Sequence, residues 1–204
     1  HFADQQITTS GKYLAIGTDG KGGSIDVTAN SLRFLSNTIN ASGTMGGGNI
    51  RLGGEYQGGK TLVTDEIKNA KVLFMTDAAK ITAKTTGTDG DGGRIIAWAD
   101  QNAFVLSHFD VTPGSKSGAG GFVEVSSGNT LSFNGNVKAG VDTRTGTLLL
   151  DPKNITIGSS SNDLSGSVTF AASPSGDSTI AASTINSTLS AGTNVVLQAN
   201  NDIT

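Results

Sequence analysis

The sequence predicts an all-β protein and, within that class, a parallel β-helix, also called a β-solenoid. Short runs of residues alternate between apolar and polar, which is the pattern of a β-strand with one buried face. Three such runs, separated by Gly, Asn and Ser turns, lie between one Gly-Gly pair and the next, and no room is left for a helix. The Gly-Gly pairs themselves recur at intervals typical of solenoid repeats.

The clearest copy of the repeat lies in residues 120–157. A Gly-Gly pair at 120–121 precedes the alternating run 122–125 (FVEV), a second run follows at 131–133 (LSF), and Val137 marks the third. In such a fold the inward residues of one coil stack on those of the next, about 4.8 Å away. Each coil therefore buries its apolar face only when other coils lie above and below it.

Aligning the Gly-Gly pairs gives the register of the other copies. The pairs start at residues 22, 47, 92 and 120, so the intervals are 25, 45 and 28 residues. We interpret the interval of 45 as two units of about 22 residues, with one extra coil, and expect eight or nine coils in all. The alignment predicts one inward column of Ile25, Ile50, Ile95 and Val123, and a second of Ile39, Ile81, Phe109 and Val137. The predicted middle strands carry Leu32/Phe34, Val72/Phe74, Phe104/Leu106 and Leu131/Phe133. Each Gly-Gly pair is expected at a corner that needs a positive φ or has no space for a Cβ.

The chain divides at residue 157. Residues 1–157 are expected to form β-helix coils, with an inserted loop or coil around 53–80. Residues 158–204 continue the β-helix after a serine-rich loop at 158–162, a strand with Val168 and Phe170, and a turn at 173–177. A short helix is expected around 178–191, packed on the solenoid as a side excursion. Its predicted face is Ile180, Thr184, Ile185 and Leu189.

The composition argues against several classes of partner. The formal net charge is −3 and Lys and Arg form no cluster, so we expect no nucleic-acid partner. No apolar run approaches the roughly 18 residues that cross a bilayer, so we expect no membrane insertion. The absence of cysteine excludes disulfides, cysteine zinc sites and thiol catalysis. Because the sequence starts at His1, without a Met or an apolar leader, the chain is expected to be part of a longer protein.

Several blocks together resemble a known family. They are residues 53–58 (GGEYQG), 92–100 (GGRIIAWAD), 120–128 (GGFVEVSSG), 146–157 (GTLLLDPKNITI) and 191–204 (AGTNVVLQANNDIT). In order and spacing they resemble the repeats of filamentous-haemagglutinin-like exoproteins, including the high-molecular-weight adhesins of Gram-negative two-partner secretion systems. The resemblance covers most of the chain beyond about residue 47. It implies a right-handed parallel β-helix, export through an outer-membrane transporter, a secreted or cell-surface location, and attachment to a glycan or receptor on host or bacterial cells. Nothing in residues 1–21 matches the secretion domain of that family, so the resemblance implies a segment of the exposed shaft.

An enzymatic function is the less favoured alternative. Parallel β-helices also include polysaccharide-degrading enzymes, whose sites need converging carboxylates. Asp89 and Asp91 are close in sequence, but they lie in a Gly-rich corner and fit a solvated turn. His108 fits an outward surface position. One turn does not supply the six to eight oxygens that calcium needs, so no catalytic residue, metal or cofactor is assigned.

A carbohydrate-binding surface is the stronger alternative. If Ile95 faces inward, Ile96 and Trp98 face outward, and Tyr56 could extend them into an exposed apolar patch that contacts a glycan. In the competing interpretation, the inserted loop 53–69 folds over this patch, because a lone Trp usually finds a cover.

Three sequons could carry N-linked sugar, although chance matches are common for such a short motif. They start at Asn40, Asn154 and Asn186. The function predicted overall is that of a non-catalytic structural and adhesive segment of a bacterial exoprotein.

Overall fold

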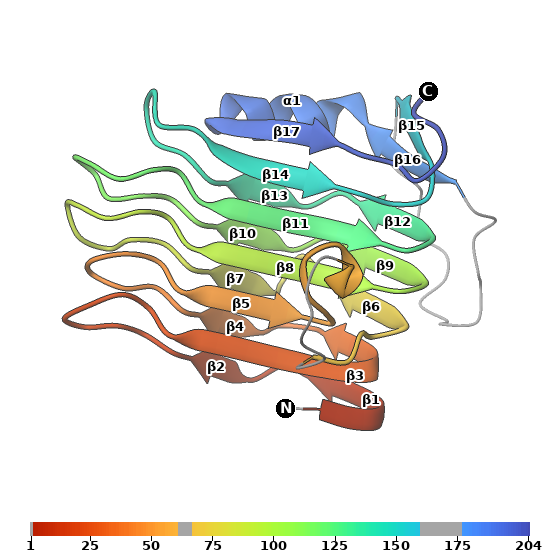
Figure 1. The fold of residues 1–204 in the computed structure, drawn as a ribbon, viewed down its shortest axis with the longest axis horizontal. Helices are drawn as coiled ribbons and strands as arrows, with labels where there is room; N and C mark the ends of the chain where they lie inside the picture. The colour runs from red at the N-terminus through yellow and green to blue at the C-terminus, as the bar shows by residue number, and fades with distance from the viewer. Residues whose placement is uncertain (1, 61–66, 160–176) are drawn as a thin grey trace.

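The protein is mostly β, with parallel strands running in successive units of three (Figure 1). The computed structural model describes residues 2–60, 67–159 and 177–204. The first strands of the units are β3 (Ser24–Phe34), β5 (Asn49–Leu52), β8 (Arg94–Ala99), β11 (Phe122–Ser127), β14 (Gly146–Leu150) and β17 (Thr193–Leu197). The middle strands are β1 (Phe2–Thr9), the second half of β3, β6 (Val72–Met75), β9 (Asn102–Val105) and β12 (Thr130–Phe133). The third strands are β2 (Lys12–Leu14), β4 (Thr38–Asn40), β7 (Lys80–Thr82), β10 (His108–Asp110) and β13 (Asn136–Lys138).

The strands form two main sheets, and every pairing between named strands is parallel. One curled sheet has the order β12-β9-β6-β3-β5-β8-β11-β14-β17, with β1 also paired to β3, and a five-stranded sheet has the order β13-β10-β7-β4-β2. The long strand β3 pairs with β5 through its first half and with β6 through its second half, so it joins the first and middle strands into one sheet. The two sheets enclose a continuous core of small and medium aliphatic side chains with a few phenylalanines.

The predicted inward columns are confirmed. In the first strands, the register places like on like through Ile25, Ile50, Ile95, Val123, Leu148 and Val195. In the third strands, it does so through Tyr13, Ile39, Ile81, Phe109 and Val137. Ile50 and Ile95 have no exposed surface, which fits their place in the middle of a column.

The predicted phase of two middle strands is wrong. Leu73 and Met75 face the core in β6, where Val72 and Phe74 were expected, and Ala103 and Val105 do so in β9 in place of Phe104 and Leu106. Both runs are apolar at nearly every position, so alternation alone does not select the inward set. The register with Leu32 and Phe34 in β3 decides it.

The extra coil expected in the interval of 45 residues is also absent. Strand β5 pairs directly with β8, and β4 pairs directly with β7, so a single unit spans the interval. Its additional residues lie between β5, which ends at Leu52, and β6, which starts at Val72. The inserted coil is therefore not found, and the insertion expected around 53–80 is confined to the residues between Leu52 and Val72, of which 61–66 lie outside the described residues. The described residues contain six first strands, fewer than the expected eight or nine coils.

The Gly-Gly corners are explained by space rather than by backbone conformation. None of the four pairs has a positive φ. A Cβ on Gly47 would lie 1.9 Å from the carbonyl oxygen of Ala83, which belongs to the opposite side of the same unit. The first and third strands therefore approach one another too closely at this corner for any side chain.

The C-terminal part departs from the prediction in one element. Residues Ser178–Ala181 form strand β16, which pairs with β15 (Ile155–Gly158), and the helix α1 spans only Ala182–Ser190. Ile180 is consequently a core residue of a strand, and Leu189 is 49% exposed. Helix α1 lies at the C-terminal end of the stack, against β13 and β17, where a third strand would otherwise follow (Figure 1). The expected strand with Val168 and Phe170 lies outside the described residues, as does most of the predicted turn at 173–177.

Candidate functional site

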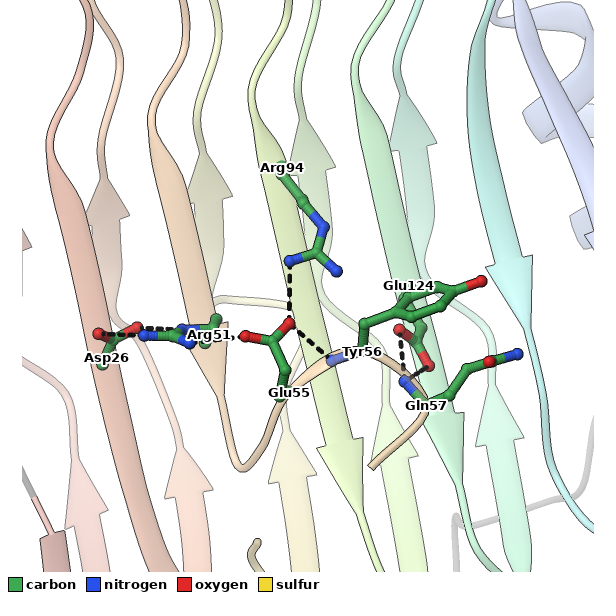
Figure 2. A network of polar contacts seen from close by, with 7 residues as sticks. All are labelled: Asp26, Arg51, Glu55, Tyr56, Gln57, Arg94 and Glu124. Carbon is green, nitrogen blue, oxygen red and sulfur yellow. Dashed lines mark hydrogen bonds and ion pairs between the residues drawn. The ribbon is translucent and has the colours of Figure 1, made fainter. Parts of the chain in front are cut away.

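A loop of residues 53–60, here called the strap, crosses the outer face of the first strands. It leaves the end of β5 and runs over β8 and β11, and it includes the short 3-10 helix Tyr56–Gly59 (Figure 2). Its Gln57 hydrogen-bonds residues that lie 67, 94 and 141 positions away in the sequence. The strap thus fastens units that are otherwise linked only through their neighbours.

The first half of the strap is held by a network of ion pairs. Arg51 donates from Nε to Asp26 at 2.7 Å and from a terminal nitrogen to Glu55 at 2.6 Å. The other carboxylate oxygen of Glu55 accepts from Arg94 at 2.9 Å and from the backbone N–H of Tyr56 at 2.8 Å (Figure 2). Burial alone would raise the pKa of Glu55. The Tyr56 N–H and the two guanidinium groups outweigh burial and lower this pKa below its ordinary value.

Tyr56 packs on the strand surface beside this network. Its ring meets the ring of Phe122 edge-on, with the centroids 5.9 Å apart. The guanidinium carbon of Arg94 lies 5.5 Å from the Tyr56 ring centroid, within the range of a cation–π contact. Tyr56 is therefore half-buried and has a structural role in seating the strap.

The centre of the strap covers a buried carboxylate. Glu124 projects from the outer face of β11 and has no exposed surface. Its two oxygens accept from the backbone N–H of Gln57 at 3.1 and 3.2 Å (Figure 2). Burial raises the pKa of Glu124 to about 7, against the opposing effect of the hydrogen bonds from Gln57 and Ser126, and the charge of Asp151 adds to the increase.

The expected exposed patch at Ile96 and Trp98 is not found, and the competing interpretation is confirmed. Both side chains point to the outer face, as the register requires, but Ile96 has no exposed surface and Trp98 is 3% exposed. Gly58 of the strap lies so close to the indole that a Cβ there would be 2.5 Å from Trp98 Cζ2. The indole N–H donates to Asp100 at 2.9 Å, so the polar edge of Trp98 is satisfied beneath the loop. Ile96 and Trp98 thus form the surface on which the strap sits, Tyr56 belongs to the strap itself, and the three do not make the exposed apolar patch expected for a glycan.

Beyond Gln57 the strap borders a polar cleft. The side-chain amide of Gln57 donates to Asp151 at 3.3 Å and to Gln198 at 2.8 Å. Asp151 is 7% exposed, and burial raises its pKa, while the nearby charge of Lys60 opposes the increase. Lys60 itself reaches Asn200, with its ammonium 3.5 Å from the side-chain oxygen.

The residues considered for catalysis or calcium lie elsewhere and act within turns. Asp89 accepts from Ser117 and Thr88 at 2.6 Å, and these bonds lower its pKa. Asp91 accepts from the backbone N–H of Ala119 at 2.8 Å, so both aspartates join one corner to the next. His108 is exposed, as expected. Among the described residues, no group of three or more His, Cys, Asp and Glu side chains is placed to hold a metal ion.

The three sequons differ in accessibility. Asn40 uses its side-chain oxygen to accept from the backbone N–H of Ser42 at 2.9 Å, and Asn154 donates to Asp177 at 2.9 Å. Asn186 lies on helix α1 and is exposed. Of the three, Asn186 is the position at which a glycan meets the least obstruction.

The sequence analysis missed Glu55, Gln57, Glu124 and Asp151. One signal for Glu124 was available, because the predicted register places this acidic side chain in the outward column beside Ile96, and the structure places Leu149 on its other side. A carboxylate between two apolar neighbours on an outer face indicates a covering segment that brings a hydrogen-bond donor.

No protein-family model matches the chain, and no curated protein shows significant similarity to it. The resemblance to filamentous-haemagglutinin-like exoproteins therefore remains a prediction from the residues quoted above. In the part of the chain that the structure describes, no helix is long and apolar enough to cross a membrane.

Proposed function

We propose that this chain is a structural and adhesive segment of a large secreted or surface-exposed bacterial exoprotein, built as a right-handed parallel β-helix. The observation that carries the proposal is the column from Ile25 to Val195, in which six successive first strands pair in parallel and place an aliphatic side chain on its equivalent. Such stacking extends in one direction and presents long outer faces, which suits a shaft that holds a contact surface away from a cell.

The mechanism is mechanical and non-catalytic. Backbone ladders and stacked apolar side chains hold the units together, and the strap adds side-chain bonds between units that are not adjacent. The outer surface that the strap leaves uncovered is then available to contact a glycan or receptor on a host or bacterial cell. For the longer protein we propose export through the outer-membrane transporter of a two-partner secretion system, with which the absence of cysteine is consistent.

A carbohydrate-binding role is the second proposal. The place that supports it is the polar cleft beside the strap, because the Trp98 surface is covered. An enzymatic role has weaker support. The raised pKa of Glu124 suits the general acid of a glycosidase, but the pKa of Asp151 is raised as well, whereas the second carboxylate of a glycosidase stays ionised, and Glu124 has no exposed surface beneath the strap. A general acid must reach the bond it protonates, so catalysis would require the strap to open.

Attachment of the purified chain to cells tests the proposed function. Beads coated with the chain are expected to adhere to epithelial or Gram-negative bacterial cells in a saturable way, and soluble chain should compete. Beads coated at equal density with an unrelated protein of similar charge serve as the control. Adhesion no greater than that control on both kinds of cell would contradict an adhesive role.

A further inference from the structure

The cleft at the end of the strap has a volume of about 510 Å³, which is the size of a small-ligand site. It lies where the strap meets the C-terminal ends of β14 and β17. It is lined by Gln57, Lys60, Asp151, Gln198, Ala199, Asn200 and Ile203. Five of these seven side chains are polar or charged, and two are small or aliphatic.

The hydrogen-bonding capacity of this cleft is mixed and only partly used. On the donor side, no bond within the described residues uses the side-chain nitrogens of Gln198 and Asn200, and the Lys60 ammonium makes one long contact at 3.5 Å. On the acceptor side, Asp151 uses one carboxylate oxygen toward Gln57 and retains the other, and Gln57 retains its side-chain oxygen. Unused donors and unused acceptors therefore belong to side chains that line the same cleft.

We propose that this cleft binds a neutral, hydroxyl-rich saccharide. Each sugar hydroxyl both donates and accepts, so a pair of adjacent hydroxyls meets the free oxygens of Asp151 and Gln57 while accepting from Gln198, Asn200 and Lys60. A phosphate or sulfate offers only acceptors and would meet the Asp151 carboxylate with like charge. A cation would meet the Lys60 ammonium.

The apolar part of the lining fits the same class of ligand. Ile203 is 50% exposed and Ala199 is half-buried, so the cleft offers aliphatic surface on which the C–H face of a sugar ring can lie. The inference deepens the proposed adhesive function by naming a ligand class and the residues that contact it, and it rests on that function.

Saturation-transfer NMR and calorimetry on the whole chain test this inference. Lactose, cellotetraose and mannotriose serve as neutral probes, and a heparin-derived tetrasaccharide serves as the anionic probe. The test variant is the double substitution Gln198→Ala and Asn200→Ala, which removes two exposed donors together with the oxygens that accept from Gln57 and Lys60. The matched control is Asn194→Ala on β17, an exposed amide that donates to Thr145 and does not line the cleft. Circular dichroism checks that both variants keep the parent fold.

We expect at least one neutral probe to bind, the double variant to weaken that binding on the order of tenfold, and the control to leave it unchanged. Binding that is equal in the parent and the double variant would overturn the cleft as the site, while the adhesive function would stand. Binding of the anionic probe alone would overturn the neutral class of ligand. If no probe binds but coated beads still adhere to cells, the saccharide inference fails alone, and if adhesion also fails, the proposed function fails with it.

Discussion

The substitution Glu124→Gln tests how the strap is held over the outer face. Glu124 is fully buried, and its pKa is raised from 4.5 to about 7. The folded state therefore binds the proton more tightly than the unfolded state does. Between pH 4.5 and 7 the unfolded chain has lost the proton while the folded chain keeps it, so stability falls as the pH rises through this window. At about 1.4 kcal/mol per pKa unit, the loss from this one group is about 3 kcal/mol.

Gln is neutral and nearly isosteric with Glu, and its side-chain oxygen still accepts from the Gln57 N–H. We therefore expect Glu124→Gln and the parent to have similar free energies of unfolding at pH 5. At pH 8 the variant should be the more stable by roughly 1–3 kcal/mol, because the parent then carries a buried charge whose cost its stronger hydrogen bonds offset only in part.

Denaturant unfolding of both proteins at pH 5 and pH 8 gives four free energies, and the difference between the two pH changes isolates Glu124. A parallel pH dependence in parent and variant, or a parent that is the more stable at pH 8, would refute the reasoning. The first result would mean that the Glu124 carboxylate is hydrated, and the second that its bonds to the strap outweigh its burial.

Three further predictions concern the strap and the core. Gly58→Ala places a Cβ 2.5 Å from the indole of Trp98, at a backbone position whose φ is +69°. We therefore expect the free energy of unfolding to fall by about 1–3 kcal/mol and the Trp98 fluorescence to become red-shifted and more quenchable. Unchanged fluorescence would contradict the covering of the indole by the strap. Glu55→Gln removes the negative charge that Arg51 and Arg94 share, so urea unfolding at pH 7 should show a free energy of unfolding lower by about 1–3 kcal/mol. The difference from the parent should shrink at acidic pH, because the lowered pKa of Glu55 contributes stability that is lost when this carboxylate is protonated. A loss that does not depend on pH would contradict this prediction. Ile95→Ala should lower the free energy of unfolding by about 2–5 kcal/mol in the same assay, because Ile95 has no exposed surface. Val196→Ala should lower it far less, because Val196 is 40% exposed. Equal losses for the two variants would contradict the inward column.

The sequence predicted the columns well because a period of two and short Gly-containing turns leave little freedom in register. Ile50 and Ile95 could be aligned across an interval of 45 residues although the interval itself was misinterpreted. The phase of β6 could not be predicted, because VLFM is apolar on both faces and the choice depends on contact with Leu32 and Phe34. The local pattern of apolar and polar residues does not contain information on that contact between strands.

The path of the strap is even harder to predict from local sequence. Residues 53–60 contain glycines that indicate a loop, but the path of a loop depends on its tertiary contacts. Its partners Glu124 and Gln198 lie 67 and 141 residues further along the chain. The outward direction of Trp98 was predictable from alternation, and its burial was not, because the cover comes from the same distant loop.

Disulfide trapping between third strands tests the in-register stack most directly, because the chain contains no cysteine of its own. Lys80 and His108 are exposed partners in adjacent strands, and Asn136 is the next residue in the same column. Cα atoms about 4.8 Å apart in neighbouring parallel strands can be bridged, whereas positions two strands apart cannot. We expect Lys80→Cys with His108→Cys to form a disulfide under mild oxidation and Lys80→Cys with Asn136→Cys to remain reduced. Equal crosslinking of both pairs, or none in the first, would contradict the stacking of like residues on like.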